Sequence, residues 1–238
     1  MKNEKIAVFA TLGKPFSFYM IKNMLDCDIQ IDCIILDGKR CTEKDLSIWN
    51  DRTKGKFPLS DFSIFENYNI PTFFFKNHCS ASTESFLKNR DISLIINAGT
   101  PRILKNNILS IPTRGVLNVH PGILPKYRGC TVVEWSIYND DKVGATAHFM
   151  TEGIDEGPII LTEEYSFLKG DSYSGVRIKV YENSFSLMSK AIKHVITNDC
   201  TSNTMKNQGE GSYFKVMKDD LLLQVKKKLE LGMYKYQE

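Results

Sequence analysis

The chain has 238 residues, of which 42% are hydrophobic and 25% are charged, and its formal net charge is +3. This is the composition of an ordinary globular protein, long enough for one domain with a sizeable core. So small a net charge argues against nucleic acid as a partner, and no apolar run approaches the roughly 18 residues of a membrane span. The six scattered cysteines form no CxxC pair and no signal peptide is visible, so we expect a cytoplasmic protein.

Short apolar runs alternate with helical patterns in the first half of the chain. The runs are nearly continuous, as in parallel strands covered on both faces, and lie at residues 5–10, 31–37, 72–75 and 93–99. Helices are predicted by the apolar spacing over 15–25 and by the serine caps that open 80–91. The alternation predicts an α/β fold of the Rossmann-like type, with a mostly parallel twisted sheet and helices on both faces. The polar segment 38–71 is predicted to be an insertion that lies over a strand edge.

The second half of the chain predicts a buried strand at 116–119, a short helix at 132–140, and strands at 142–150 and 159–165. A long helix follows, opened by an Asp171/Ser172 cap. The last helix carries an apolar stripe that could serve a homodimer or an intrachain contact, formed by Leu221, Leu222, Val225 and Leu229. We predict one main domain over residues 1–200 and a small C-terminal extension, a loop and a helix, over 201–238.

Polar side chains mark the end of the strand at 116–119. Asn118 and His120 are two residues apart, so both side chains lie on one face at the carboxyl end of the strand, where open α/β sheets bind ligands. Both can donate hydrogen bonds to an oxygen that becomes negative. Asp155, in a glycine-flanked loop, could take up a proton, so the three residues suit the addition of an amine to a carbonyl carbon. A zinc site made of His120, His148 and Asp155 is an open alternative.

Two stretches together resemble the folate-dependent formyltransferases: "LNVHPGILPKYRG" (117–129) and "GATAHFMTEGIDEGPII" (144–160). The resemblance implies that Asn118, His120 and Asp155 form the catalytic trio and that 10-formyltetrahydrofolate is the formyl donor, with no metal. It also implies a folate pocket built from "NAGTPRIL" (97–104) and the loop after residue 151. The residues assigned to that pocket are Thr100, Arg102, Ile103, Leu104, Glu152, Gly153 and Ile154.

The acceptor of the formyl group follows less directly from the resemblance. Methionyl-tRNA formyltransferases of this family are longer, and a charge of +3 does not suit tRNA. Glycinamide ribonucleotide formyltransferases carry a glycine-rich phosphate loop after the first strand, where this chain has "FATLGKPFSF" (9–18). The insertion 48–62 and the tail 209–218 resemble the sugar N-formyltransferases, which act on nucleotide-linked amino sugars such as dTDP-amino-dideoxyhexoses for surface polysaccharides such as O-antigen.

A nucleotide-linked amino sugar needs cations for its diphosphate and a flat surface for its base. The residues predicted to bind it are Arg52, Lys54, Lys56, Lys126, Arg128 and Tyr213. Phosphoribosylglycinamide is the alternative acceptor, and a non-catalytic folate- or nucleotide-binding module is a more distant alternative. A Rossmann dehydrogenase is disfavoured because no G-x-G-x-x-G motif follows the first strand. We expect small-molecule partners, with neither nucleic acid nor membrane among them.

Overall fold

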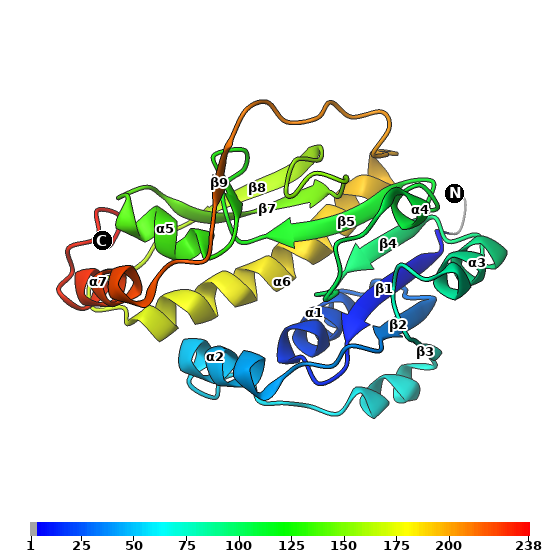
Figure 1. Ribbon diagram of the computed structural model, residues 1–238, viewed down its shortest axis with the longest axis horizontal. Coiled ribbons are helices and arrows are strands. Elements are labelled where there is room, and N and C mark those ends of the chain that lie inside the picture. The colour runs from blue at the N-terminus through cyan, green and yellow to red at the C-terminus, as the bar shows by residue number, and fades with distance from the viewer. Residues whose placement is uncertain (1–3) are drawn as a thin grey trace.

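A computed structural model, which describes residues 4–238, contains a seven-stranded sheet with the strand order β3-β2-β1-β4-β5-β7-β8 (Figure 1). The strands up to β5 pair in parallel, whereas β7 is antiparallel to both β5 and β8. The predicted α/β fold with a mostly parallel sheet is therefore confirmed. The bounds are β1 Ile6–Thr11, β2 Cys33–Asp37, β3 Thr72–Phe75, β4 Leu94–Asn97, β5 Gly115–His120, β7 Val143–Phe149 and β8 Ile159–Tyr165.

Helices cover both faces of this sheet because alternate strand residues point to opposite sides. On β1, Val8 belongs to the core beneath α1 and α6, while Phe9 belongs to the core beneath α3 and α4. The long helix α6 runs along one face of the sheet (Figure 1). The bounds are α1 Pro15–Asp26, α2 Glu43–Thr53, α3 Ala81–Asn89, α4 Asn106–Leu109, α5 Val132–Tyr138, α6 Tyr173–Thr197 and α7 Asp219–Glu230. Among the residues that the structure describes, no helix is long and apolar enough to cross a membrane.

The helix starts follow the capping residues in the sequence. Ser80 accepts a hydrogen bond from the backbone of α3, and Ser172 does the same for α6, as predicted. Helix α2 begins with a capping box, in which Thr42 and Asp45 each accept from the other's backbone N–H. The sequence prediction did not include this helix, although the threonine and aspartate three residues apart are its usual signature.

The segment 38–71 was predicted to be an insertion that lies over a strand edge, but its helix packs against α6 instead. It contains α2 and a short 3-10 helix, Phe62–Tyr68, and it buries Trp49, Phe57, Phe62 and Phe65. Trp49 packs against Tyr181 of α6 with ring centroids 4.5 Å apart, and its Nε1 donates to the carbonyl of Phe57. The strand at the sheet edge is β3, which is not covered on both faces, since Phe74 is 58% exposed.

The C-terminal segment after α6 packs against the rest of the molecule. Strand β9 Ser212–Phe214 pairs in parallel with β6 Tyr127–Gly129, which continues the chain after β5 (Figure 1). Val225 and Leu229 of α7 are buried within the chain, so the apolar stripe of this helix serves an intrachain contact. The predicted boundary near residue 200 falls just after α6.

We predict that Phe9→Ala lowers the free energy of unfolding by about 3–5 kcal/mol, because Phe9 is fully buried and stacks on His78 at 4.2 Å between ring centroids. The matched control is Phe74→Ala on the exposed edge strand, for which we expect a change within about 0.5 kcal/mol. Urea unfolding followed by circular dichroism measures both. Equal losses in the two variants would contradict this assignment of the core.

Candidate active site

The three residues predicted to be catalytic lie together at the carboxyl end of β5. Asn118 and His120 end that strand, and Asp155 comes from the loop between β7 and β8, with one carboxylate oxygen 3.3 Å from Nδ1 of His120. This loop must approach the sheet closely. At Gly157 a Cβ atom would stand 1.9 Å from the carbonyl oxygen of Phe149, so only glycine fits there.

The ring of His120 is buried and held at both nitrogens. Its Nε2 lies 2.7 Å from the carbonyl oxygen of Tyr127, which can only accept, so Nε2 carries the proton. Its Nδ1 faces the carboxylate of Asp155. Burial lowers the pKa of His120 below its ordinary value, and Asp155 and the Tyr127 carbonyl oppose this only in part. At neutral pH the ring is therefore neutral, with Nδ1 free to take up a proton.

A second histidine, His148 of β7, belongs to the same cluster. Its Nε2 lies 3.1 Å from Nδ2 of Asn118 and 3.6 Å from a carboxylate oxygen of Asp155. Its Nδ1 donates to the carbonyl oxygen of Phe149 at 2.8 Å. Burial lowers the pKa of His148 to about 4, so this ring is also neutral. Sequence reasoning considered His148 only as a zinc ligand, because the register that pairs it with Asn118 is not visible in the sequence.

The arrangement of these groups does not suit a metal ion. Nε2 of His120 is used by the Tyr127 carbonyl, and Nε2 of His148 accepts from the amide of Asn118. Within residues 4–238, no group of three or more His, Cys, Asp or Glu side chains is arranged to hold a metal ion. The interpretation of His120, His148 and Asp155 as a zinc site therefore has no support in the geometry.

A cavity of about 170 Å³ opens beside this cluster, bounded by His148 and Asp155. Ile103, 71% exposed, and Ile154 give its rim an apolar character suited to a flat ring. All of the residues predicted for a folate pocket line it except Thr100, whose hydroxyl bonds to a histidine instead. The lining residues are Arg102, Ile103, Leu104, His148, Met150, Thr151, Glu152, Gly153, Ile154 and Asp155. We call this space the small cavity.

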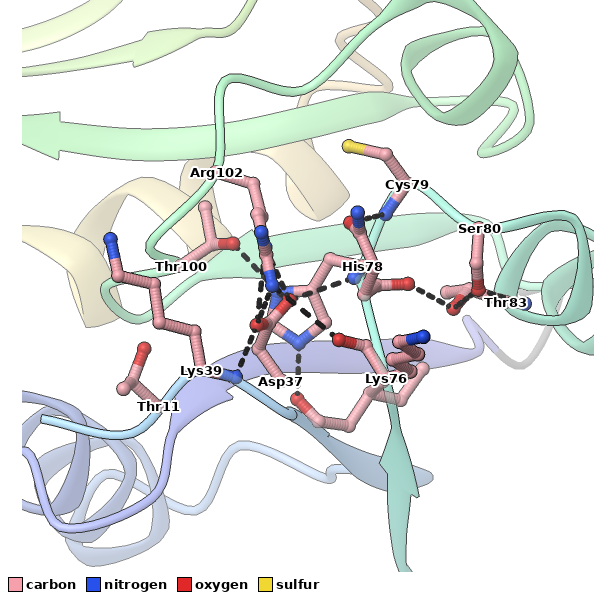
Figure 2. A network of polar contacts seen from close by, with 12 residues as sticks. Thr11, Asp37, Lys39, Lys76, His78, Cys79, Ser80, Thr83, Thr100 and Arg102 are labelled. Carbon is pink, nitrogen blue, oxygen red and sulfur yellow. Dashed lines mark hydrogen bonds and ion pairs between the residues drawn. The ribbon is translucent and has the colours of Figure 1, made fainter.

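One wall of the small cavity is fixed by an ion pair at the end of β2. Arg102 donates two hydrogen bonds to Asp37 through Nε and a third through Nη2, at 2.7 to 3.1 Å (Figure 2). The carboxylate of Asp37 also accepts from the backbone N–H groups of Lys39 and His78. Burial alone would raise the pKa of Asp37, but these hydrogen bonds outweigh it and lower the pKa. The position of the Arg102 guanidinium is thus fixed by its hydrogen bonds to Asp37.

His78 fastens the same wall at a second point. It is fully buried and stacks against Phe9. Its Nε2 donates to the carbonyl oxygen of Ile35 at 2.9 Å, and its Nδ1 lies 2.6 Å from the hydroxyl of Thr100 (Figure 2). Burial lowers the pKa of His78 to about 4. The neutral ring therefore accepts from Thr100, which anchors the segment that bears Arg102.

A second and larger cavity, of about 630 Å³, lies on the other side of this segment. Pro101 lines it, whereas the next residue, Arg102, lines the small cavity. Pro121 also lines it, so this cavity reaches the residue directly after His120, although Asn118 and His120 themselves line neither cavity. We call it the large cavity. Its cationic and aromatic lining residues are Lys14, Lys39, Arg40, Arg52, Arg177, Phe16, Trp49 and Tyr181, and Asp45 is its acidic one.

The three cations predicted to act together, Arg52, Lys54 and Lys56, are separated because α2 ends between the first and the second of them. Arg52 lines the large cavity, whereas Lys54 and Lys56 do not. Helix α2 ends at Thr53, and Lys54 adopts a left-handed conformation and pairs with Asp51 at 3.0 Å. Proximity in sequence therefore did not predict proximity in space. The cations that accompany Arg52 come instead from the loops after β1 and β2 and from α6.

The remaining predicted acceptor residues lie outside the large cavity. Lys126 pairs with Asp141 at 2.7 Å on the surface. Arg128 is buried and donates to the carbonyl oxygen of Gly209 at 2.7 Å, lining a separate cavity of about 410 Å³. Tyr213 lies on β9 and is half exposed. Lys126 and Arg128 are therefore engaged within the protein, and Tyr213 lines neither of the two cavities beside the segment at Pro101 and Arg102.

Gln208, which the sequence analysis did not single out, holds the loop of Asp155 in place. Its side-chain amide donates to the carbonyl oxygens of Asp155 at 3.1 Å and Gly157 at 2.6 Å. The loop is fixed from the other side as well, because the carboxylate of Asp155 accepts from the backbone of Gly129 at 2.9 Å. No local motif marks Gln208, since the contact joins residues about fifty positions apart.

One wall of the large cavity rests on a buried charged group that the sequence analysis also missed. Glu134 of α5 accepts from the hydroxyl of Tyr173 at 2.6 Å and lies 3.5 Å from both Arg52 and Arg177. Arg177 donates to the hydroxyl of Tyr181 at 2.7 Å. Burial opposes the charge of Arg177, but Glu134 and Tyr181 raise its pKa overall. With two arginines and one glutamate, this wall carries a net positive charge toward the large cavity.

Comparison with known proteins assigns the chain to a family. Residues 50–192, well over half of the chain, match the family described as formyl transferase. The chain belongs to the formyl transferase family. Asn118, His120 and Asp155, with both sides of the small cavity, lie within the matched residues.

Relatives of several kinds share this formyl transferase fold. Methionyl-tRNA formyltransferase from Clostridium tetani is 29% identical over 189 residues, which cover 76% of this chain and 59% of that protein. The chain thus spans little more than half the length of this relative. A 4-N formyltransferase from Francisella tularensis has a TM-score of 0.59 at 23% identity, covering 90% of this chain and 76% of that one. Glycinamide ribonucleotide transformylase 1 from Symbiobacterium toebii has a TM-score of 0.64 at 19% identity, covering 86% of this chain and 93% of that one. The two solved structures share the fold.

We predict that Asp37→Asn lowers the free energy of unfolding at pH 7 by about 3 kcal/mol, because it removes one partner of a buried ion pair. The pKa of Asp37 is lowered in the folded state, so this contribution is complete above ~pH 4, the unfolded value, and is lost as the pH falls through the lowered pKa. The difference between the variant and the wild type should therefore shrink in acid. Urea unfolding at a series of pH values measures it.

The control is Asp26→Asn, which removes the exposed ion pair of Lys22 and Asp26 on α1. Such a pair contributes well under 1 kcal/mol, so we expect almost no change. An Asp37→Asn protein as stable as the wild type at pH 7 would contradict the importance of the ion pair with Arg102.

Proposed function

We propose that the protein transfers the formyl group of 10-formyltetrahydrofolate to the amine of a nucleotide-linked amino sugar, for the synthesis of surface polysaccharide such as O-antigen. The observation that carries this proposal is the position of the two cavities on either side of the segment at Pro101 and Arg102. The small cavity is lined by Asp155 of the cluster, and the large cavity is lined by Pro121, which directly follows His120. A group can therefore pass from a donor in one cavity to an acceptor in the other at that cluster.

The small cavity fits the flat ring of the folate. Ile103, Leu104, Met150 and Ile154 supply apolar surface. Backbone groups of the loop that contains Gly153 would supply hydrogen bonds at the edge of the ring. At about 170 Å³ it has room for the ring system only. The rest of the folate would extend past the exposed rim at Ile103, so its tail would lie in solvent.

The cluster would act on the transferred group through hydrogen bonds and proton transfer. Asn118 would donate to the formyl oxygen as negative charge develops there. An amine with a pKa near ~8 is largely protonated at neutral pH, so a proton must leave it before it attacks the formyl carbon. His120 is neutral and its Nδ1 faces Asp155. This pair would take up the proton that the amine loses and supply one to the departing folate nitrogen.

The large cavity supports an acceptor with phosphate groups. Lys14, Lys39, Arg40 and Arg52 line it from separate elements, and a diphosphate would be bound by several of them at once. Its volume of about 630 Å³ lies within the usual range for a small-molecule site, and Phe16 and Tyr181 offer apolar walls for a sugar or base. Phosphoribosylglycinamide, with a single phosphate, is the second candidate, because the folds of its transferases match nearly the whole of this chain.

The proposal predicts that the purified protein moves one formyl group from 10-formyltetrahydrofolate to one nucleotide-linked amino sugar in a panel read by mass spectrometry. The panel holds dTDP-, UDP- and GDP-linked amino sugars, phosphoribosylglycinamide and methionyl-tRNA. Asn118→Ala should lower kcat about 10²–10³-fold, because it removes the donor to the formyl oxygen. His120→Ala should lower kcat about 10²–10⁴-fold, because it removes the ring that takes up the proton together with Asp155. Transfer to phosphoribosylglycinamide or methionyl-tRNA alone would overturn the sugar acceptor while leaving the catalytic residues in place.

We further predict that Arg52→Ala raises the KM for the acceptor about tenfold or more and leaves the KM for folate nearly unchanged. The reason is that Arg52 lines the large cavity and not the small one. Lys56→Ala is the matched control, since it removes the same charge from an exposed position that lines neither cavity. Steady-state kinetics with each substrate varied in turn gives both constants. Equal effects of the two changes on the acceptor KM would argue against the large cavity as the acceptor site.

A further inference from the structure

Asn97, the last residue of β4, has a side chain whose orientation is fixed by the backbone. Its Oδ1 accepts from the N–H groups of Gly99 at 3.0 Å and Thr100 at 2.8 Å. Two backbone donors identify that atom as the oxygen, because an amide nitrogen cannot accept. The nitrogen of Asn97 must then be the atom that lies 2.9 Å from Oδ1 of Asn118.

This contact in turn fixes the amide of Asn118. Because Asn97 donates to its oxygen, Nδ2 of Asn118 points to Nε2 of His148 at 3.1 Å. His148 can accept there, since its own proton is on Nδ1 and goes to the carbonyl oxygen of Phe149. Every hydrogen bond in this chain therefore has a fixed donor. The backbone N–H groups of residues 99–100 donate to Asn97, Asn97 donates to Asn118, Asn118 donates to His148, and His148 donates to the carbonyl oxygen of Phe149.

The orientation matters because the two ends of an amide have opposite hydrogen-bonding roles. Turned over, Asn118 would present its oxygen, an acceptor, where the formyl oxygen needs a donor. The residues that the structure describes give Nδ2 of Asn118 one acceptor, His148, and leave its second N–H for a ligand. Within the cluster, Asn97 is the group that donates to the amide oxygen of Asn118.

We propose that Asn97 is a positioning residue that keeps the amide N–H of Asn118 directed at the formyl oxygen. This proposal rests on the proposed formyl transfer. The amide of Asn97 is already engaged within the protein, its oxygen by Gly99 and Thr100 and its nitrogen by Asn118, so Asn97 would act through Asn118 and not on the substrates directly. Its other contacts, with Gly99 and Thr100, hold the start of the segment 97–102. Thr100 and Arg102 anchor the rest of that segment (Figure 2).

Asn97→Asp tests the proposal, because a carboxylate has the same shape and still accepts from Gly99 and Thr100 but cannot donate to Asn118. We expect kcat to fall about 10²–10³-fold, the usual cost of one lost oxyanion donor, with the KM for folate changed less than ~3-fold. The matched control is Asn77→Asp. Asn77 is likewise half-buried, and its oxygen accepts from the backbone N–H two residues on, that of Cys79 at 2.8 Å. This control should keep the wild-type kcat.

A second measurement does not depend on activity. In the wild type, ¹⁵N NMR of the imidazole of His148 should show its proton on Nδ1. In Asn97→Asp, the turned amide brings the oxygen of Asn118 to Nε2 of His148, so a proton should appear on Nε2. Thermal unfolding of both variants checks that they fold.

The outcomes separate this proposal from the proposed function. If Asn97→Asp retains the wild-type kcat, or if Asn77→Asp loses as much, the positioning role is overturned. An unchanged ring state of His148 in Asn97→Asp also overturns it. If the wild type transfers no formyl group to any acceptor, the proposed function fails, and the NMR signal of His148 still decides whether Asn97 orients Asn118.

Discussion

The antiparallel pairing of β7 with β5 sets Asn118 opposite His148 and His120 opposite Thr146. Side chains alternate along a strand, so a shift of this register by one residue would move His148 to the other face of the sheet. The pairing also determines where the loop after β7 leaves the sheet, and hence where Asp155 meets the two histidine rings. At Gly157 the loop passes so close to the carbonyl oxygen of Phe149 that a side chain there would collide with it. The geometry of the site therefore depends on this one pairing.

A cluster of buried polar groups is costly unless every member has a partner. Here the partners are largely backbone groups: the carbonyls of Tyr127 and Phe149 fix the two histidine rings, and the N–H of Gly129 holds Asp155. Backbone partners do not rotate away, so each ring is held in one protonation pattern. Burial then lowers the pKa of both rings and leaves them neutral. Desolvation thus keeps both rings unprotonated, and Nδ1 of His120 keeps a lone pair that faces Asp155.

The sequence predicted the elements whose signals are local and missed the contacts that join distant segments. Apolar runs marked the strands, serines marked the starts of α3 and α6, and the spacing of Asn118 and His120 placed both on one face of β5. His148 entered the cluster only through the register of β7. Arg52 was grouped with Lys54 and Lys56 because they are close in sequence, yet the helix ends between them. Asn97 was noted only as the first residue of the segment 97–104, and Gln208 belongs to no motif. Their roles depend on pairs of residues 21 and 53 positions apart.

The segment at residues 97–102 gives the site its division into two sides. Asn97, its first residue, donates a hydrogen bond to Asn118. Thr100 donates to the neutral ring of His78, and Arg102 donates to Asp37. Each anchor comes from a different element, so the segment cannot shift as a loop would without breaking several hydrogen bonds. With Pro101 facing the large cavity and Arg102 the small one, the wall between the cavities is also the element that orients the amide of Asn118. A donor and an acceptor bound on either side would therefore meet at a cluster that is already in place, and the reaction would need little rearrangement of the protein.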